Sequence, residues 1–149
     1  MLTTRRGSNS NTTTTCTLVV FSIGGQRLAT RTEEVGGVWP WTNAMPVPSG
    51  TAFMNALVRR GEDVLPVFDL AAKLNVRVRG ATSLCLIATR KDGPMAIRID
   101  EDIPTLHVVE QASIRHTTGA NSEAVGTCEI GLDKVPIYSF RGSTRRADT

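Results

Sequence analysis

Short apolar runs, separated by turns that contain glycine, are the feature that most constrains the fold of this chain. Residues 17–23 and 83–89 are rich in β-branched and aliphatic side chains, and residues 95–99 place a large apolar side chain at every second position. Gly24-Gly25 and Gly93 bound these runs, where tight hairpin turns need residues that accept a positive φ. Many short strands joined in this way predict an all-β barrel or a pair of barrels. The alternation at residues 95–99 also predicts a half-buried strand.

The length of the chain favours two barrels over one. A chain of 149 residues suits one domain or two intimate subdomains, and a single small barrel needs fewer residues. We therefore expect two β-barrel subdomains within residues 17–140. The polar segment 1–16, with a run of threonines at residues 12–15, is expected to be a disordered tail. Residues 141–149 are expected to form a basic polar tail.

Residues 58–70 hold more position-specific residues than any other segment. Gly61 permits a tight bend after two arginines, and Pro66 marks the apolar strand as bulged or at an edge, because proline donates no hydrogen bond. Asp69 is placed to cap a short helix over residues 70–74, which Asn75 can end in the left-handed conformation. The segment therefore predicts a bend, a strand and one capped turn of helix.

The charge and aromatic content argue against a nucleic-acid partner. The formal net charge is +3, and aromatic residues make up only 5% of the chain. Surfaces that bind single-stranded nucleic acid stack bases on aromatic rings. Much of the positive charge lies near the ends of the chain, at Arg5, Arg6, Arg141, Arg145 and Arg146. We interpret these arginines as solubilising, with a polyanion-binding patch as the alternative.

The cysteines and the N-terminal segment predict a cytoplasmic protein. Cys16, Cys85 and Cys128 lie far apart without a Cys-x-x-Cys motif, which is typical of buried thiols in a reducing compartment. The first residues contain no apolar run of the kind that a signal peptide needs. The longest apolar stretch, residues 18–21, is far too short to cross a bilayer, so we expect no direct membrane insertion.

No motif in the chain indicates catalysis. There is no Gly-x-Ser-x-Gly, no His-x-x-x-His and no phosphate-binding glycine loop. His107 lies in an apolar run and is expected to be a rim or core histidine. The carboxylates of residues 100–102 suit a turn better than a cation site. Trp39 and Trp41, in a proline-rich segment, are expected to anchor a loop or edge connection. We therefore expect a binding protein without catalytic residues, cofactor or metal.

The order of these features resembles the CheW-like family of chemotaxis adaptor domains from about residue 17 to residue 140. The most specific part of the resemblance is the central block Arg60-Gly61, Leu65-Pro66-Val67 and Asp69-Leu70. Weaker similarities lie at residues 18–25 and at Glu34-Val35, Met45-Pro46 and Ile99-Asp100. The family often has Asn-Leu before its Arg-Gly, where this chain has Val58-Arg59.

The resemblance implies two intertwined five-stranded, SH3-like β-barrel subdomains with one short helix and no catalytic machinery. It also implies a scaffold that joins a histidine kinase of the CheA type to the cytoplasmic tips of chemoreceptors. By their places in the match, Arg60 and Glu34 are candidate protein-binding residues, and Arg59 and Val58 bear on the choice of partner. For Arg60 the alternative is a structural role, with its guanidinium bonded to neighbouring carbonyls or a carboxylate.

Two other functions stay open. The chain could serve a chemosensory pathway other than flagellar chemotaxis, such as one that governs pili or a second messenger. It could also be a small β-barrel ligand-binding protein or enzyme that uses the carboxylates of residues 100–102. A deep pocket that converges on these carboxylates would favour the second alternative, and a filled barrel would count against it.

Overall fold

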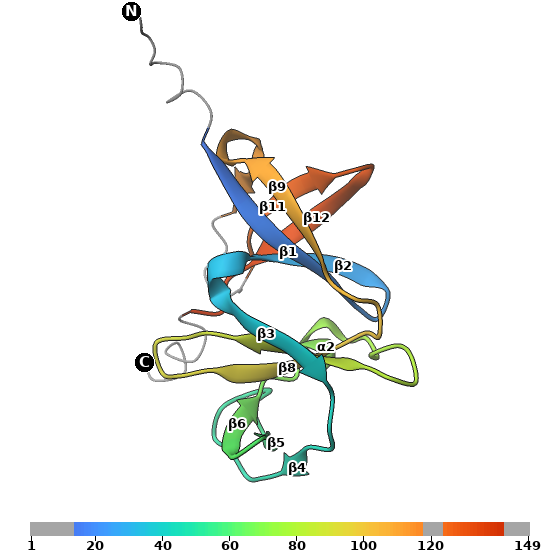
Figure 1. The fold of residues 1–149 in the computed structure, drawn as a ribbon, viewed down its shortest axis with the longest axis vertical. Coiled ribbons are helices and arrows are strands. Elements are labelled where there is room, and N and C mark those ends of the chain that lie inside the picture. Colours follow the sequence, from blue (N-terminus) through green and yellow to red (C-terminus); the bar gives the residue numbers. More distant parts are fainter. Residues whose placement is uncertain (1–13, 118–123, 142–149) are drawn as a thin grey trace, which may run out of the picture.

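The computed structural model describes residues 14–117 and 124–141, which form two six-stranded sheets placed one above the other (Figure 1). The first sheet has the strand order β10-β11-β12-β2-β1-β9, and the second has the order β3-β7-β8-β6-β5-β4. The strands of the first sheet are β1 (Thr15–Ile23), β2 (Gln26–Arg31), β9 (Thr105–Glu110), β10 (Arg115–His116), β11 (Ala124–Ile130) and β12 (Asp133–Tyr138). Those of the second are β3 (Val35–Pro40), β4 (Met45–Pro46), β5 (Ala56–Arg60), β6 (Asp63–Val67), β7 (Leu84–Ala88) and β8 (Met95–Ile99).

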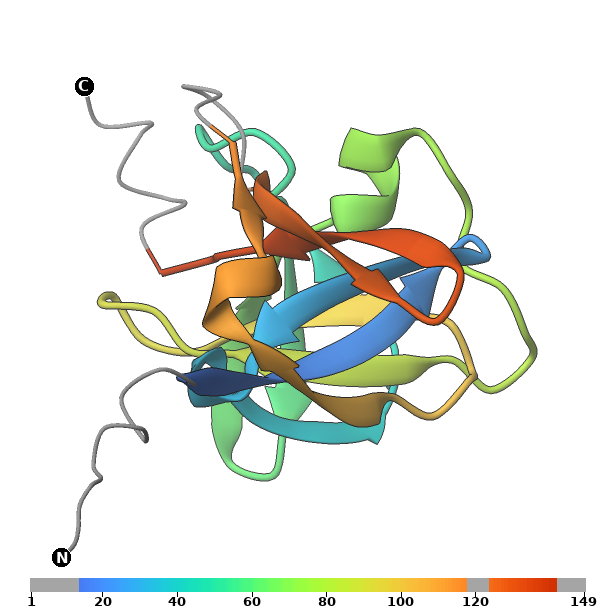
Figure 2. The same ribbon diagram turned by 90° about the horizontal axis from the view of Figure 1, so that it is seen from above.

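The two subdomains are intertwined because the chain crosses between the sheets twice. A 3-10 turn, η2 (Thr32–Glu34), leads from β2 to β3, and residues 100–104 lead back from β8 to β9. A second 3-10 turn, η3 (Gln111–Ser113), follows β9, and the only α-helix in the described residues is α2 (Leu70–Leu74). Strand β12 pairs in parallel with β2, so the end of the described chain lies against its beginning. Seen from above, strands of the first sheet cross over those of the second, with α2 at their margin (Figure 2).

These features confirm the predicted all-β fold with two subdomains and one short α-helix. Each sheet has six strands instead of the implied five, and each includes a strand of two residues, β10 or β4. The expected tails lie mostly outside the described residues, although β1 already begins at Thr15. No helix in the described part of the chain is long and apolar enough to cross a bilayer.

The turn between β1 and β2 requires both of its glycines. Gly24 and Gly25 have φ values of 61° and 82°, and two positive φ angles define the type I′ hairpin turn. A Cβ atom on Gly24 would lie 2.7 Å from the Cβ of Val76, which belongs to the segment after α2. The turn between β1 and β2 is therefore packed against the segment between α2 and β7, whose flanking elements belong to the second subdomain.

Three apolar clusters form the core. The largest joins the two sheets, because it takes side chains from β1 and β2, from β7 and β8, and from α2. The second lies within the first sheet, and the third lies within the second sheet around Val58, Leu65 and Cys85. The buried side chains that dominate the largest cluster are Phe21, Ile23, Leu28, Phe68, Leu70, Leu86, Met95, Ile97, Ile99 and Phe140.

The expectation that residues 95–99 form a half-buried strand was wrong in one respect. Met95, Ile97 and Ile99 are buried as expected, but Ala96 on the opposite face of β8 is also fully buried. The reason is that β8 lies inside the second sheet, with one face in the cluster between the sheets and Ala96 in the cluster within the second sheet. Only Arg98 of this strand is exposed.

The stretch 58–70 has the local structure that its residues predict. Gly61, with φ 62°, turns the chain between β5 and β6. The Asp69 carboxylate accepts a hydrogen bond of 3.0 Å from the backbone N–H of Ala72, and Asn75 ends the helix in the left-handed conformation. Pro66 pairs with a residue of β5 on one side. On the other side β6 pairs with β8 only at Val67, so the missing N–H of the proline removes no hydrogen bond from a long ladder there.

Candidate partner-binding site

Arg60 lies where the two ends of the second sheet approach each other. β3 is one end of the strand order, and β5 is next to the other end. The Cζ atom of Arg60, on β5, lies 4.3 Å from the ring centroid of Trp39, on β3. At this distance the guanidinium and the indole form a cation–π contact. The contact therefore connects two strands that share no hydrogen-bond ladder.

The three consecutive candidates on β5 have different environments. Val58 is buried in the cluster within the second sheet, whereas Arg59 is exposed and Arg60 is partly buried. Side chains of a strand alternate between its two faces, so Val58 and Arg60 lie on one face and Arg59 on the other. Among these three, Arg59 is the most exposed, and Val58 packs in the core of the second sheet.

Glu34 binds the end of the first sheet. Its carboxylate accepts a hydrogen bond of 2.9 Å from the backbone N–H of Phe140, and the Ser139 hydroxyl lies 3.2 and 3.1 Å from its two oxygens. The residue is only 4% exposed. The described hydrogen bonds of its carboxylate run to these residues and not to Arg60, so the structure does not join the two candidates by a hydrogen bond. These bonds support a structural role, and the predicted partner contact of Glu34 stays a prediction.

A cleft of about 490 Å³ lies beside Glu34. Its walls include Arg31, His116 and Tyr138, from β2, β10 and β12, and Arg141 after β12. The sequence reasoning did not identify this cleft, because its walls come from strands that are far apart in the chain and meet only in the first sheet. The alternation of apolar and polar residues within one strand does not predict which other strands will lie beside it.

Asp100 binds backbone amides. Its carboxylate accepts hydrogen bonds from the N–H groups of Gly24 at 2.9 Å, Gly25 at 2.8 Å and Arg79 at 2.7 Å. Asp100 is 1% exposed, whereas its neighbours Glu101 and Asp102 are exposed. The described residues contain no group of three or more His, Cys, Asp or Glu side chains that could hold a metal ion. This arrangement counts against the alternative in which residues 100–102 form a binding or catalytic cluster.

The cysteines among the described residues are buried, as predicted. Cys85 faces Trp39 across the ladder between β7 and β3. Burial raises the pKa of the Cys85 thiol to about 11, and a hydrogen bond with the backbone of Ile97 and the positive charge of Arg60 oppose this rise only in part. The thiol is therefore protonated at neutral pH and is a poor nucleophile.

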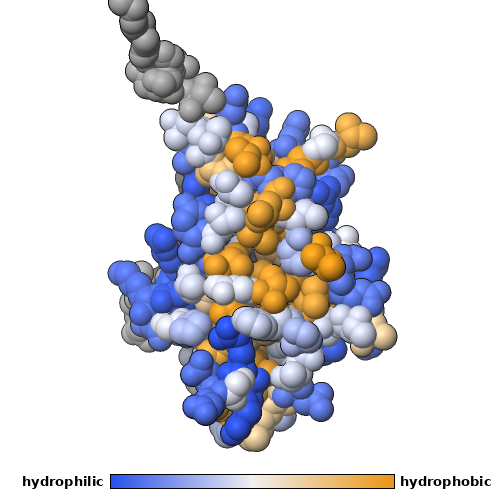
Figure 3. Space-filling model, in the orientation of Figure 1, coloured by the Kyte–Doolittle hydropathy of each residue, from blue (hydrophilic) through white to orange (hydrophobic). Residues whose placement is uncertain are grey.

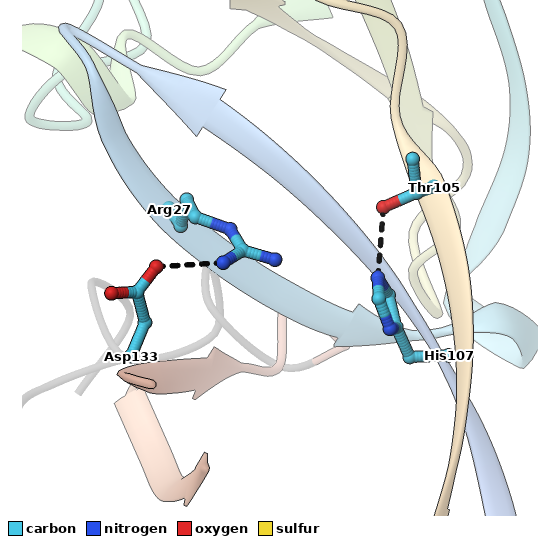
Figure 4. Close-up of polar contacts among 4 residues, drawn as sticks. All are labelled: Arg27, Thr105, His107 and Asp133. Carbon is cyan, nitrogen blue, oxygen red and sulfur yellow. Dashed lines mark hydrogen bonds and ion pairs between the residues drawn. The ribbon is translucent and has the colours of Figure 1, made fainter. Parts of the chain in front are cut away.

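His107 occupies a rim position on β9. It is half-buried, and its Nε2 atom lies 3.0 Å from the hydroxyl of Thr105 on the same strand (Figure 4). The expected rim or core role is therefore confirmed.

Figure 4 also shows an ion pair between Arg27 on β2 and Asp133 on β12, whose charged atoms are 2.7 Å apart. Both of these side chains are partly exposed, so the pair contributes at most about 1 kcal/mol to the stability of the first sheet.

Strand β9 and the residues just before it carry an apolar surface that was not predicted from the sequence. Ile103, Leu106 and Val108 are 81%, 68% and 68% exposed, and we call these three residues the β9 patch. Leu106 and Val108 share one face of the strand, because they are two residues apart. Figure 3 shows apolar side chains gathered over the region of β1, β9 and β3. β9 also ends the strand order of the first sheet, so its outer edge pairs with no other described strand.

Comparison with known proteins places this geometry in a family. The profile of the CheW-like domain matches residues 17–134. A probable chemotaxis protein CheW from Rhizobium etli is 32% identical over 66 residues, which cover 44% of this chain and 43% of that protein. The match thus spans less than half the length of the curated relative.

A solved structure supports the same assignment at the level of the fold. The scaffolding protein TtCheW from Thermoanaerobacter tengcongensis superposes with a TM-score of 0.69 at 18% sequence identity. The superposition covers 87% of this chain and 92% of that one. Because the family profile covers most of the sequence and the architecture agrees, the chain belongs to the CheW-like domain family.

Proposed function

We propose that the protein is a non-catalytic cytoplasmic adaptor that couples chemoreceptors to a histidine kinase of the CheA type. The observation that carries this proposal is the match of the CheW-like profile to residues 17–134. The names of the two similar proteins, a probable chemotaxis protein and a scaffolding protein, support it. The bonded Asp100 carboxylate and the protonated Cys85 thiol agree with a function in binding.

The β9 patch is the surface that we assign to the kinase. An edge strand with unpaired backbone groups can add to another sheet, and exposed apolar side chains beside it supply area to bury. In the proposed complex, the β9 patch packs against an edge of the kinase's own CheW-like domain. Charged residues are scarce at the centres of stable interfaces, which agrees with the composition of this patch.

Arg59 and Arg60 form the surface that we assign to the receptor. They place two positive charges at the end of β5, next to the exposed ring of Trp39. A helical receptor tip that presents apolar side chains with a carboxylate at the rim would match this combination. Glu34 contributes indirectly, since its hydrogen bonds hold η2, and with it the start of β3, against the end of the first sheet.

Co-purification with two separate baits tests the proposal. The folded full-length chain is incubated with the CheW-like domain of a CheA-type kinase and, separately, with a cytoplasmic receptor fragment, both from the source organism. We expect both baits to retain the chain. If folded protein is retained by neither bait, or by one alone, the adaptor role is wrong. The genes that adjoin this one then assign the pathway, either flagellar chemotaxis or a chemosensory system for pili or a second messenger.

A further inference from the structure

A cavity of about 230 Å³ lies within the second sheet, and two arginines, Arg59 and Arg60, are among the residues that line it. Most of its wall is apolar, formed by Trp39, Val58, Leu65 and Ile87, and Arg60 supplies the partly buried charge. Thr42 and Arg59, which are exposed, also line the cavity, so it reaches the surface. An apolar cavity with a few convergent polar groups is the usual form of a small-molecule site.

The charge in this cavity is not neutralised by the protein. No acidic side chain lines the cavity among the described residues. Asp63 stands opposite Arg60 in the ladder between β5 and β6, but no described ion pair joins them. The Nε atom of Arg60 is buried and has no hydrogen-bond partner among the described residues. A buried donor without a partner is uncommon in native structures and calls for an explanation.

A carboxylate has the chemistry that this arginine lacks. The guanidinium presents Nε and Nη donors in a planar fork that matches the two oxygens of a carboxylate. The contact with the Trp39 ring uses the positive charge of the guanidinium and gives its N–H donors no oxygen acceptor, so a carboxylate can bind these donors while the contact persists. The neutral thiol of Cys85 adds a weak donor without negative charge.

The volume of the cavity limits the size of the ligand. An engineered apolar cavity of about 150 Å³ holds benzene, and pockets for drug-sized ligands begin at about 300 Å³. A cavity of about 230 Å³ lies between these limits. It therefore suits one ring or a short branched chain that carries a single carboxylate.

We propose that this cavity is a binding site for a small apolar monocarboxylate, with its carboxylate on Arg60 and its apolar part among Val58, Leu65 and Ile87. The ligand lies between β3 and β5 and adds to the cation–π contact that connects them. The site shares Arg59 and Arg60 with the surface assigned to the receptor, but the isolated chain contains all of it, so binding of the acid is measured without either partner.

Phenylacetate is the probe, and Trp39 is the reporter. The Trp41→Phe variant leaves Trp39 as the single tryptophan of the chain. We expect a saturable change in its fluorescence, with a dissociation constant in the range of about 0.1 to 1 mM. Phenylacetamide, which has the same shape without the charge, is expected to bind about tenfold more weakly or worse. Equal binding of acid and amide, or no saturable change with phenylacetate, overturns the proposal.

Two arginine variants locate the probe. Arg60→Gln is expected to weaken phenylacetate binding at least about tenfold. Arg77→Gln is the matched control, because Arg77 is exposed and lines a different cavity of about 450 Å³ beside α2. Loss of binding in Arg77→Gln but not in Arg60→Gln moves the probe to that cavity and overturns the assignment. If Arg60→Gln does not fold, the acid and amide comparison on the Trp41→Phe protein decides.

An acidic peptide distinguishes a free acid from a side chain of a protein partner. We expect a short peptide with one glutamate between leucines to bind more weakly than phenylacetate, because its backbone does not fit the cavity. A peptide that binds while phenylacetate does not would show that the cavity receives a partner's side chain, and the proposal of a small-molecule site would be wrong.

Discussion

The guanidinium of Arg60 reaches from β5 to the ring of Trp39 on β3, and its buried Nε atom has no hydrogen-bond partner among the described residues. The contact with Trp39 gives the side chain a structural role, and the Nε donor without a partner gives it a binding role. The cation–π contact stabilises the fold, but such contacts contribute only about 0.5–2 kcal/mol. The remaining donors are available to a ligand or a partner. At the scale of single residues, stability and binding can therefore be separated experimentally.

Replacement of Arg60 by alanine tests this separation. We expect Arg60→Ala to keep the fold, to lower the free energy of unfolding by about 1 kcal/mol, and to weaken retention by the receptor fragment. Arg59→Ala should leave stability unchanged, because Arg59 is exposed. Urea unfolding and the pull-down measure the two effects, with Arg77→Ala as the control for a general loss of positive charge. An unfolded Arg60→Ala protein would establish the structural role instead.

Cys85 gives the protein a dependence on pH above neutrality. Its pKa is about 11 in the folded chain against 9.0 for an ordinary thiol, so the unfolded chain loses this proton first as the pH rises. The stabilising contribution of the protonated thiol is complete below pH 9 and falls as the pH rises from 9 to 11. Urea unfolding of wild type and Cys85→Ala across this range should show a steeper decline for wild type. Parallel declines would mean that the thiol does not titrate in this way.

At the scale of the element, β9 combines an open edge with an apolar face. Proteins usually protect an edge strand with charges, prolines or bulges. β9 runs from Thr105 to Glu110 without a lysine or proline, and its exposed side chains include Leu106 and Val108. Exposed apolar edges of this kind mark interaction sites or aggregation hazards. The strand therefore has the properties of an element that is covered in an assembly.

A double charge substitution on this strand tests the proposed kinase contact. Leu106→Lys with Val108→Lys should leave the thermal unfolding temperature nearly unchanged, because both side chains face solvent. It should weaken binding to the kinase domain at least about tenfold. Leu132→Lys is the matched control, since Leu132 is fully exposed at the turn between β11 and β12 and not on β9. Equal weakening by the control variant, or none by the double variant, would contradict the assignment of β9.

At the scale of the whole molecule, two buried carboxylates tie the sheets together. Asp100, after β8 of the second sheet, binds the turn between β1 and β2 of the first. Glu34, before β3, binds Phe140 after β12 and accepts the N–H of Thr89 on its own carbonyl at 2.8 Å. Each connection joins segments that are distant in the sequence. The relative position of the sheets, and so of the two proposed partner surfaces, depends on them.

Asp100→Ala is expected to destabilise the protein by about 3 kcal/mol. The substitution leaves three backbone N–H groups without their charged acceptor, and unsatisfied buried donors cost about 1–3 kcal/mol each, less where water can reach them. Asp102→Ala, two residues away and exposed, should change stability by less than about 0.5 kcal/mol. Urea unfolding measures both values. Hydrogen exchange should be faster at Gly24, Gly25 and Arg79 in the Asp100 variant, and unchanged exchange there would show that another contact holds the turn.

Local features of the fold could be predicted because they depend on neighbouring residues. The glycine pair at residues 24–25, the Asp69 cap and the left-handed Asn75 each follow from the conformations that these residue types allow. The family and its two-subdomain fold also followed from the order of such local signals. The half-burial of β8 was wrong, because the burial of Ala96 depends on strands that pair from elsewhere in the chain.

The candidate site shows the same division. The sequence identified Arg60 by its place before Gly61, but not its contact with Trp39, which lies 21 positions away in the chain and meets it only when the second sheet curves. It named Asp100 among a cluster of carboxylates, and only the structure showed its three amide donors.

The sequence by itself thus determined the strands, the turns and the cap, since each depends on residues within a few positions of one another, and it indicated the family through the order of these features along the chain. The tertiary structure alone decided which charges are paired, which apolar side chains remain exposed on β9 and where the cavity at Arg60 opens. These properties arise from contacts between strands that are distant in the sequence, and the period of a single strand does not specify which strand will lie beside it.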